Sequence, residues 1–296
     1  MKLVERKDIN ESEWTRWCTQ NPLVGPFCQL EYLDAVAENV LFLIDEGNGG
    51  IALPYKVKFG VKTLYTPVFC RWISLVGKQQ LTSEKIDGIV KDALRQADVY
   101  TQHNLFGGEP EELIYQTVNE QQYSLNTQAK RKIKKAKTEE WKIVFDEPAE
   151  TAIDLIESAL KNKFANLEDS SFPLLRKLAT NFEKSGQLKI ISLHDSSNKL
   201  IGSLLLIESE SRVLYLKGAC IESVKMKGGM YLLMNEAIQS AFASNKTFDF
   251  GGSRIPGVRK FNLSFGSVDQ TYFHYKWSNG PFWYTLLKNL GKALKK

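Results

Sequence analysis

KMKGGMYLLMNEAIQSAF (residues 225–242) and TFDFGGSRIPGVRKFNLSFGS (residues 247–267) are the stretches that decide the fold. From Met230, apolar residues recur at the spacing of a helix that faces a core, at Leu233, Met234, Ala237, Ile238 and Ala241. RVLYLKGAC (residues 212–220) comes before it and has the composition of a strand, and Thr247–Phe250 is a second, short strand. This order of strand, glycine loop, helix and strand predicts a crossover unit beside a sheet.

The glycine loop that opens this helix is a candidate anion site. Backbone N–H groups gather at a helix N-terminus, where the helix dipole also favours negative charge. Lys225 and Lys227 add positive charge beside Gly228 and Gly229. We predict that these four residues bind an anionic part of a substrate, with an ordinary tight turn as the alternative.

Composition predicts a globular protein. The chain has 296 residues, 43% of them hydrophobic, which is enough for one large or two ordinary domains with sizeable cores. The net charge of +5 suits an anionic ligand but does not by itself imply nucleic acid. The N-terminus has no apolar signal segment and the histidines lack metal-ligand spacing, so we expect a cytoplasmic protein with no metal site.

The order of the predicted elements occurs twice. Residues 1–115 read as two helices, three strands, a helix and a strand, and residues 116–278 read as helices, a three-strand meander, a helix and a strand. A strand over 115–125 should open the second half. The sequence therefore predicts an α+β protein of two domains, 1–115 and 116–278, followed by a basic amphipathic helix over 279–296.

Several motifs resemble those of a known group of proteins. They are QAKRKIKKAKTEEWKIVF (128–145), MYLLMNEAIQSAF (230–242), FDFGGSRIPGVRKFNLSFGS (248–267), TYFHYKW (271–277) and, in the first half, IALPYKVKFGVKTLYTPVFCRW (51–72). The chain resembles the Fem-type aminoacyltransferases and the related acetyltransferase 6 family, which belong to the GNAT-like superfamily. The resemblance implies two tandem GNAT-like (acyl-CoA N-acyltransferase-like) domains with mixed sheets flanked by helices. It also implies a cleft between the domains and transfer of an acyl or aminoacyl group to an amine.

The chain departs from the family at two positions. GNAT enzymes bind the pyrophosphate of acetyl-CoA on a loop of the form Q/R-x-x-G-x-G/A, whereas this chain has Lys225 at the first position and Met230 at the last. Fem-type proteins place a lysine after the DFGG strand, where this chain has Asn262. Asn262, Lys260 two residues before it and the strand-end carboxylate Asp249 are the catalytic candidates. Asp249 would act as a base or orient the acceptor amine, or else accept hydrogen bonds in a purely structural role.

The predicted substrate-binding residues cluster after the same strand. They are Gly251, Gly252, Ser253, Arg254 and Arg259, which would hold anionic parts of the substrates. A basic helix around Arg131, within residues 126–137, is a candidate for a nucleotide-linked precursor or tRNA, with a solvated face as the alternative. Residues 281–296 combine an apolar face with lysines, which suits either peripheral contact with a membrane or docking on protein.

Three functions remain open at this point. The first is an acyl- or aminoacyltransferase that moves an acyl group from a CoA thioester or an aminoacyl-tRNA to an amine, for example on a cell-wall or polysaccharide precursor. The second is an ordinary acetyl-CoA-dependent N-acetyltransferase, and the third is a non-catalytic binding protein on the same fold. We expect no tightly bound cofactor, since acyl-CoA or aminoacyl-tRNA would be a substrate, and the sequence predicts no oligomeric state.

Overall fold

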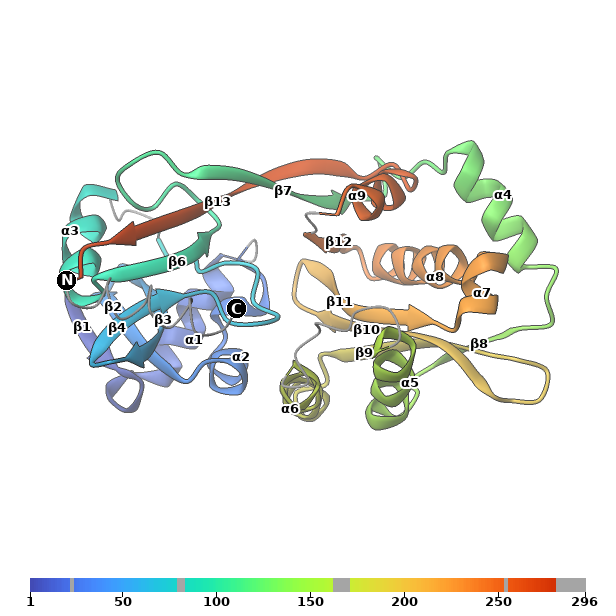
Figure 1. Ribbon diagram of the computed structural model, residues 1–296, viewed down its shortest axis with the longest axis horizontal. Coiled ribbons are helices and arrows are strands. Elements are labelled where there is room, and N and C mark those ends of the chain that lie inside the picture. Colours follow the sequence, from blue (N-terminus) through green and yellow to red (C-terminus); the bar gives the residue numbers. More distant parts are fainter. Residues whose placement is uncertain (22–23, 79–82, 162–170, 253–254, 281–296) are drawn as a thin grey trace, which may run out of the picture. The chain divides into compact units, whose positions relative to one another are not determined.

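The computed structural model describes residues 1–21, 24–78, 83–161, 171–252 and 255–280 (Figure 1). Contacts divide the chain into unit 1, Met1–Leu113 with Thr271–Lys296, and unit 2, Ile114–Gln270. We expected the second domain to run to residue 278. Instead, β13 (Val268–Ser278) leaves unit 2, and its residues 273–278 pair with strand β6 of unit 1. The predicted tail contact at 281–296 lies outside the described residues.

Unit 1 is built on one mixed sheet. Its strands run in the order β1 (Lys2–Glu5), β2 (Asn39–Asp45), β3 (Gly49–Lys58), β4 (Val61–Tyr65), β6 (Gln96–Thr101) and β13, and β5 (Leu75–Gly77) pairs with β3. Helices α1 (Glu11–Gln20) and α2 (Leu30–Val36) contribute to one apolar cluster, and α3 (Ser83–Ala93) contributes to another. Residues of β2 belong alternately to the two clusters, so helices cover both faces of the sheet.

Local sequence explains the helices of unit 1. The side chain of Asn10 caps α1 by accepting a hydrogen bond from the N–H of Glu13, and Trp14 and Trp17 are buried one turn apart. Trp14 packs edge-on against Phe42 with ring centroids 4.7 Å apart. The helix predicted after the three strands of residues 1–115 is observed as α3, which ends at Ala93.

Unit 2 is likewise built on a mixed arrangement of strands. Its strands run in the order β7 (Glu111–Val118), β12 (Thr247–Gly252), β11 (Arg212–Cys220), β10 (Leu200–Glu208), β9 (Leu188–His194) and β8 (Lys142–Phe145). Its helices are α4 (Thr127–Ala136), α5 (Ala149–Lys161), α6 (Ser171–Lys184), α7 (Glu222–Lys227), α8 (Gly229–Ala243) and α9 (Pro256–Leu263). The strand expected over 115–125 ends early, at Val118, because Asn119 and Gln122 exchange side-chain-to-backbone hydrogen bonds in a turn.

Helices also cover both faces of the unit 2 sheet. α8 lies on one face and α5 on the other, as Figure 1 shows. The α8 face holds the main core, in which Leu233, Phe248 and Phe265 are fully buried. The predicted stripe of α8 is confirmed, since Leu233, Met234, Ala237, Ile238 and Ala241 are all buried.

Both units contain the same crossover. In unit 1, β4 is followed by α3 and then by β6, which pairs with β4 in parallel; in unit 2, β11 is followed by α7 and α8 and then by the parallel β12. Each parallel pairing covers three residues, 63–65 with 96–98 and 212–214 with 247–249. The predicted tandem order of elements is therefore confirmed.

Candidate active site

The candidate site lies in unit 2, where β11 and β12 stop pairing. Their ladder ends at Leu214 and Asp249, although β11 continues to Cys220 and β12 to Gly252. We call the region beyond this point the β11–β12 divergence. On its other edge β11 pairs with β10, so residues 215–218 have no strand partner on the β12 side within the described chain. Backbone groups on that side are candidates for pairing with an extended ligand, although the Gly218 carbonyl already accepts a hydrogen bond from the Tyr215 hydroxyl.

A β-bulge lies at the same point. The β10–β11 register shifts so that Leu205 opposes Lys217 and Leu206 opposes Tyr215, which leaves Leu216 as the extra residue. Bulges redirect the backbone and are frequent next to active sites. Leu216 is half-buried, and it follows the last β12-paired residue of β11 by two positions.

The equivalent region of unit 1, the β4–β6 divergence, is filled by the chain itself. Past Asp98, Ile73 forms a parallel bridge to Thr101, and its N–H donates to the carbonyl of Tyr100 at 2.9 Å. The N–H of Tyr100 donates to the Thr66 hydroxyl at 2.8 Å. The edge of β6 that β4 leaves exposed is thus already occupied in unit 1.

Register assigns the side chains at the β11–β12 divergence to faces of the sheet. Phe248 and Phe250 belong to the α8 core, so Asp249 between them faces the side covered by α5. Lys217 opposes Leu205, whose neighbours Leu204 and Leu206 belong to the α8 core, so Lys217 faces the α5 side as well. An amine and a carboxylate therefore lie on one face, on the two strands that flank the divergence.

Asp249 is already engaged by protein groups. Its side chain is only 4% exposed, accepts a hydrogen bond from the Gly251 N–H at 2.9 Å and pairs with the Arg212 guanidinium at 3.4 Å. Gly251 has a φ of +75°, a conformation that glycine adopts without strain. The carboxylate therefore holds the end of β12 in place, and its predicted role in catalysis stays a prediction.

Sequence reasoning missed Lys217. Its side chain is half-buried and has no hydrogen-bond or ion-pair partner in the described part of the chain. Burial lowers the pKa of its amine below the ordinary value. A lysine within the apolar strand RVLYLKGAC was the available signal. Beside it, burial raises the pKa of Tyr215, whose hydroxyl donates to the Gly218 carbonyl at 3.3 Å.

The glycines of the predicted anion loop are explained by packing. Gly228 has a φ of +100° and ends α7, and a Cβ there would lie 2.5 Å from the backbone oxygen of Lys132 in α4. A Cβ on Gly229 would lie 2.3 Å from a methyl group of Val224. Helix α4 thus approaches this backbone closely, at the point where the family resemblance implied a pyrophosphate.

The two lysines of that segment are in the short helix α7 rather than in an open loop. Lys225 is exposed, and Lys227 forms an ion pair with Glu139 at 2.7 Å. In place of the expected glycine loop, the structure has helix α7, then Gly228 in the left-handed conformation, and then α8. Its predicted role in binding an anion stays a prediction.

Asn262 is buried in a polar network and points away from solvent. It is 3% exposed, and its amide donates to the Gln116 side chain at 3.0 Å. Gln116 in turn donates to Asp269 at 2.9 Å, and Asp269 pairs with Arg259. The hydrogen bond from Arg259 lowers the pKa of Asp269. This chain of contacts joins β7, α9 and the start of β13.

The remaining candidates around α9 are dispersed. Arg259 and Lys260 lie within α9. Lys260 is exposed and forms no ion pair with any described residue. Gly252 pairs with Tyr115 on β7. Ser253 and Arg254 lie outside the described residues.

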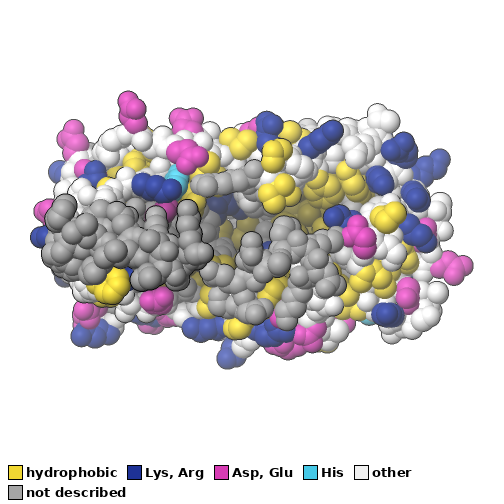
Figure 2. All heavy atoms as spheres, in the orientation of Figure 1, with side chains coloured by type: hydrophobic (Ala, Val, Ile, Leu, Met, Phe, Trp, Pro, Cys, Tyr) yellow, Lys and Arg dark blue, Asp and Glu magenta, His cyan; other side chains and the backbone are white. Residues whose placement is uncertain are grey.

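Helix α4 presents a basic surface whose charges are not neutralised. Its side packed on α8 and α7 buries Ala129, Ile133 and Ala136. The cations Lys130, Arg131, Lys134, Lys135 and Lys137 are exposed, and none forms an ion pair with a described residue. Figure 2 shows blue side chains gathered over this helix.

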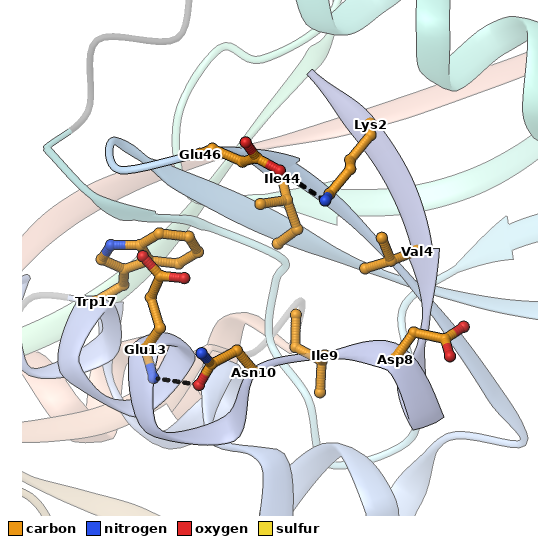
Figure 3. Close-up of a pocket in the computed structure, with 9 residues that line it drawn as sticks. All are labelled: Lys2, Val4, Asp8, Ile9, Asn10, Glu13, Trp17, Ile44 and Glu46. Atoms are coloured by element: carbon orange, nitrogen blue, oxygen red, sulfur yellow. Dashed lines mark hydrogen bonds and ion pairs between the residues drawn. The ribbon is translucent and has the colours of Figure 1, made fainter.

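Unit 1 contains a separate small pocket of about 260 Å³ between β1, β2 and α1 (Figure 3). Its apolar wall includes Val4, Ile9 and Trp17, and its rim carries an ion pair between Lys2 and Glu46 at 2.6 Å. Strands β1 and β2 lie at the opposite end of the sheet order from β6. This pocket is therefore not equivalent to the divergence of unit 2.

Within the described ranges, no group of three metal-ligating side chains is arranged to hold an ion. In the same ranges, no helix has the length and apolar character needed to cross a bilayer.

Comparison with known proteins identifies this fold. Residues 124–261 match the sequence model of the family described as Acetyltransferase (GNAT) domain. The resemblance inferred from the motifs is thereby confirmed, and the chain is a tandem GNAT-fold protein. No curated protein matches the sequence.

Solved structures show the same fold at low identity. A conserved protein of unknown function from Bacteroides thetaiotaomicron is 11% identical with a TM-score of 0.64, over 93% of this chain and 100% of that one. FemX is 11% identical with a TM-score of 0.62, over 93% and 97%. A tandem GNAT protein from the clavulanic acid biosynthesis pathway is 10% identical with a TM-score of 0.53, over 95% and 99%.

Proposed function

We propose that the protein is an N-acyltransferase whose donor places its acyl group in the β11–β12 divergence of unit 2. One observation carries the proposal: β11 has a bulge at Leu216 and an unpaired edge over residues 215–218. An extended acyl carrier would complete that edge as an added strand does. The acceptor amine would attack the carbonyl directly, with positioning and an oxyanion donor as the main contributions of the protein.

Backbone at the bulge is the best-placed source of the oxyanion donor. The register with β10 passes over Leu216, and the ladder with β12 has already ended. A fixed N–H aimed at the developing negative charge lowers the barrier because it needs no reorganisation during reaction. Asn262 is less suited to this task, since its amide is buried and donates to Gln116.

The carrier that we favour is an aminoacyl-tRNA held by α4. Five exposed cations on this helix lack ion-pair partners among the described residues, which is the charge pattern that phosphate backbones select. The close approach of α4 to Gly228 also places backbone where a CoA pyrophosphate would be expected. FemX has the same fold, but its low identity makes that likeness supporting context only.

Acyl-CoA is the second candidate donor. The observation in its favour is the match of residues 124–261 to the acetyltransferase family. The two carriers can be separated by filter binding of mixed tRNA at two salt concentrations, alongside thermal melts with acetyl-CoA. Lys134→Glu should weaken tRNA binding and reduce the salt slope by about 1, whereas Lys199→Glu, on a turn distant in sequence from α4, should not.

Transfer itself is tested at the bulge. Leu216→Pro removes the N–H, while Leu216→Ala keeps it, so transfer from either donor to an amine acceptor should fail only in the proline variant. A thermal melt shows whether that variant remains folded. Full transfer activity in a folded Leu216→Pro variant would show that the bulge N–H takes no part in the mechanism. Failure of both tRNA and acetyl-CoA to bind would overturn the proposed function.

A further inference from the structure

Lys217 is a half-buried lysine in β11. It opposes Leu205 across the sheet and lies directly after the bulge residue Leu216. A lysine buried in this way loses hydration, and a partner normally compensates for that loss. Lys217 has no hydrogen-bond or ion-pair partner in the described ranges, in contrast to Lys246, which pairs with Glu208 at 2.6 Å.

The charged groups around Lys217 form ion pairs or hydrogen bonds with other residues. On its own face of β11 and β12, Arg212 and Asp249 pair with each other. The carboxylates of α5 bond to Arg176 of α6, namely Glu150, Asp154 and Glu157. Glu208 of β10 is held by Lys246, and Glu236 of α8 accepts from Asn235 on the opposite face of the sheet. No ion pair among the described residues holds Lys217 in its charged form.

We propose that Lys217 is the proton acceptor of the acyl transfer, an inference that rests on the proposed function. The ε-amine follows the bulge residue and flanks the strand edge at which the donor would lie. Lowering of its pKa by burial increases the neutral fraction of the amine, which is the form that can accept a proton. A lysine that is neutral at working pH is a competent general base.

The acyl-transfer step with Lys217 as proton acceptor balances in atoms and protons. The acceptor nitrogen forms a bond to the carbonyl carbon, the carbonyl oxygen becomes an oxyanion, and the proton of the nitrogen passes to Nζ of Lys217. The tetrahedral intermediate then collapses, and the bond to the leaving sulfur or ribose oxygen breaks. The ammonium of Lys217 returns the proton to that leaving atom, so the products are an amide, a free thiol or hydroxyl, and neutral Lys217.

The first test measures Lys217 in the free, full-length protein. Lysines are dimethylated with ¹³C-formaldehyde, and their titration is followed by NMR. The Lys217→Arg variant identifies the Lys217 signal, and Lys199→Arg identifies an exposed lysine for comparison. We expect the Lys217 signal to titrate at clearly lower pH than the Lys199 signal. Coincident titration of the two would overturn the proposal.

The second test asks whether a donor covers Lys217. Acetylation of Lys217 by an amine-reactive ester is measured by mass spectrometry alone, with acetyl-CoA and with mixed aminoacyl-tRNA. We expect several-fold slower modification of Lys217, and not of Lys199, with the donor that binds. Unchanged modification overturns the proposal; separate binding measurements then show whether the proposed function fails with it.

The third test is kinetic. Lys217→Met should lower kcat by about 100-fold or more, the usual contribution of a general base, with little change in KM. It should also remove the rising limb of the pH–rate profile, and Lys217→Arg should not rescue it because arginine stays protonated. Equal loss in thermal stability and rate, with the pH profile retained, would assign Lys217 a structural role instead.

Discussion

The two strand divergences of this protein begin alike and end differently. In each unit, parallel strands pair over three residues and then separate. In unit 1 the exposed edge of β6 is closed by Ile73, with Thr66 accepting from Tyr100. In unit 2 no described segment pairs with the β12-side edge of β11 past Leu214, and a bulge and Lys217, which has no hydrogen-bond or ion-pair partner among the described residues, follow. The same fold thus closes one divergence with its own backbone, whereas the other keeps an unpaired β11 edge among the described residues.

The contrast shows why repetition of a fold does not imply repetition of a site. A nearby segment that closes an edge stabilises the unit, because backbone groups that would be unpaired gain hydrogen-bond partners. Apolar side chains of that segment are buried as well. Leaving an edge unpaired has the opposite effect on stability. An unpaired strand edge is expected where a ligand supplies the missing hydrogen bonds, because functional sites are commonly less stable locally than the rest of the fold.

The largest effect should come from emptying the divergence of unit 1. Trp72 anchors the closing segment: it is 1% exposed, and its indole N–H donates to the Val24 carbonyl. Its ring packs edge-on against Phe27 and at a tilt against Tyr272. Trp72→Ala should lower the free energy of unfolding by about 3–5 kcal/mol, as measured in denaturant, whereas Trp72→Phe should cost clearly less. Donor binding by the folded fraction should be unchanged. Loss of donor binding at unchanged stability would place the site in unit 1.

The second effect concerns the position at which Fem-type proteins carry a lysine. Asn262→Lys would bury an ammonium group beside Gln116, where Asn262 is 3% exposed. We expect a loss of about 3 kcal/mol in chemical denaturation and no gain in acyl transfer. Asn262→Leu, which introduces no charge, should cost only about 1–2 kcal/mol for the unsatisfied Gln116. Increased transfer by a stable Asn262→Lys variant would show that the family role survives here.

The third effect tests whether Asp249 is structural. Asp249→Asn leaves the Arg212 charge without its carboxylate in a largely buried place and should cost about 2 kcal/mol of unfolding free energy. Adding Arg212→Gln should recover part of that loss in a double-mutant cycle, since the two side chains interact directly. If Asp249→Asn abolishes transfer in a protein of unchanged stability, Asp249 acts in the chemistry.

Much of the fold could be predicted, because it is encoded in local periodicity. The stripe of α8 and the strands around it follow from spacing alone, and they are confirmed. The return of β13 to unit 1 could not be predicted, since nothing local distinguishes a strand that changes units. The early end of β7 depended on the Asn119–Gln122 turn, whose side-chain bonds a strand pattern does not reveal.

The candidate site was less predictable, because it depends on which backbone groups and side chains lack partners in the fold. Gly228 and Gly229 drew attention as an anion loop, but their lack of side chains is required by α4 and Val224. Lys217 went unnoticed because a single lysine in a strand reads as an edge residue. Its significance arises from the bulge at Leu216 and the early end of the β12 ladder, both of which depend on strand register.

The smallest effect is a pH dependence that distinguishes the two units. Because the pKa of Lys217 is lower in the folded protein than its ordinary value of 10.5, the unfolded chain binds more protons between these two pH values. Stability therefore rises with pH through that window, and below it the cost of burying the charged amine is fully present. Lys217→Met should raise the melting temperature at neutral pH. The difference in melting temperature between this variant and the unchanged protein should shrink as pH approaches 10.5. Lys56→Met, at an exposed lysine of unit 1, should show no such trend, and a Lys217→Met advantage that is constant with pH would mean that the amine stays charged in the fold.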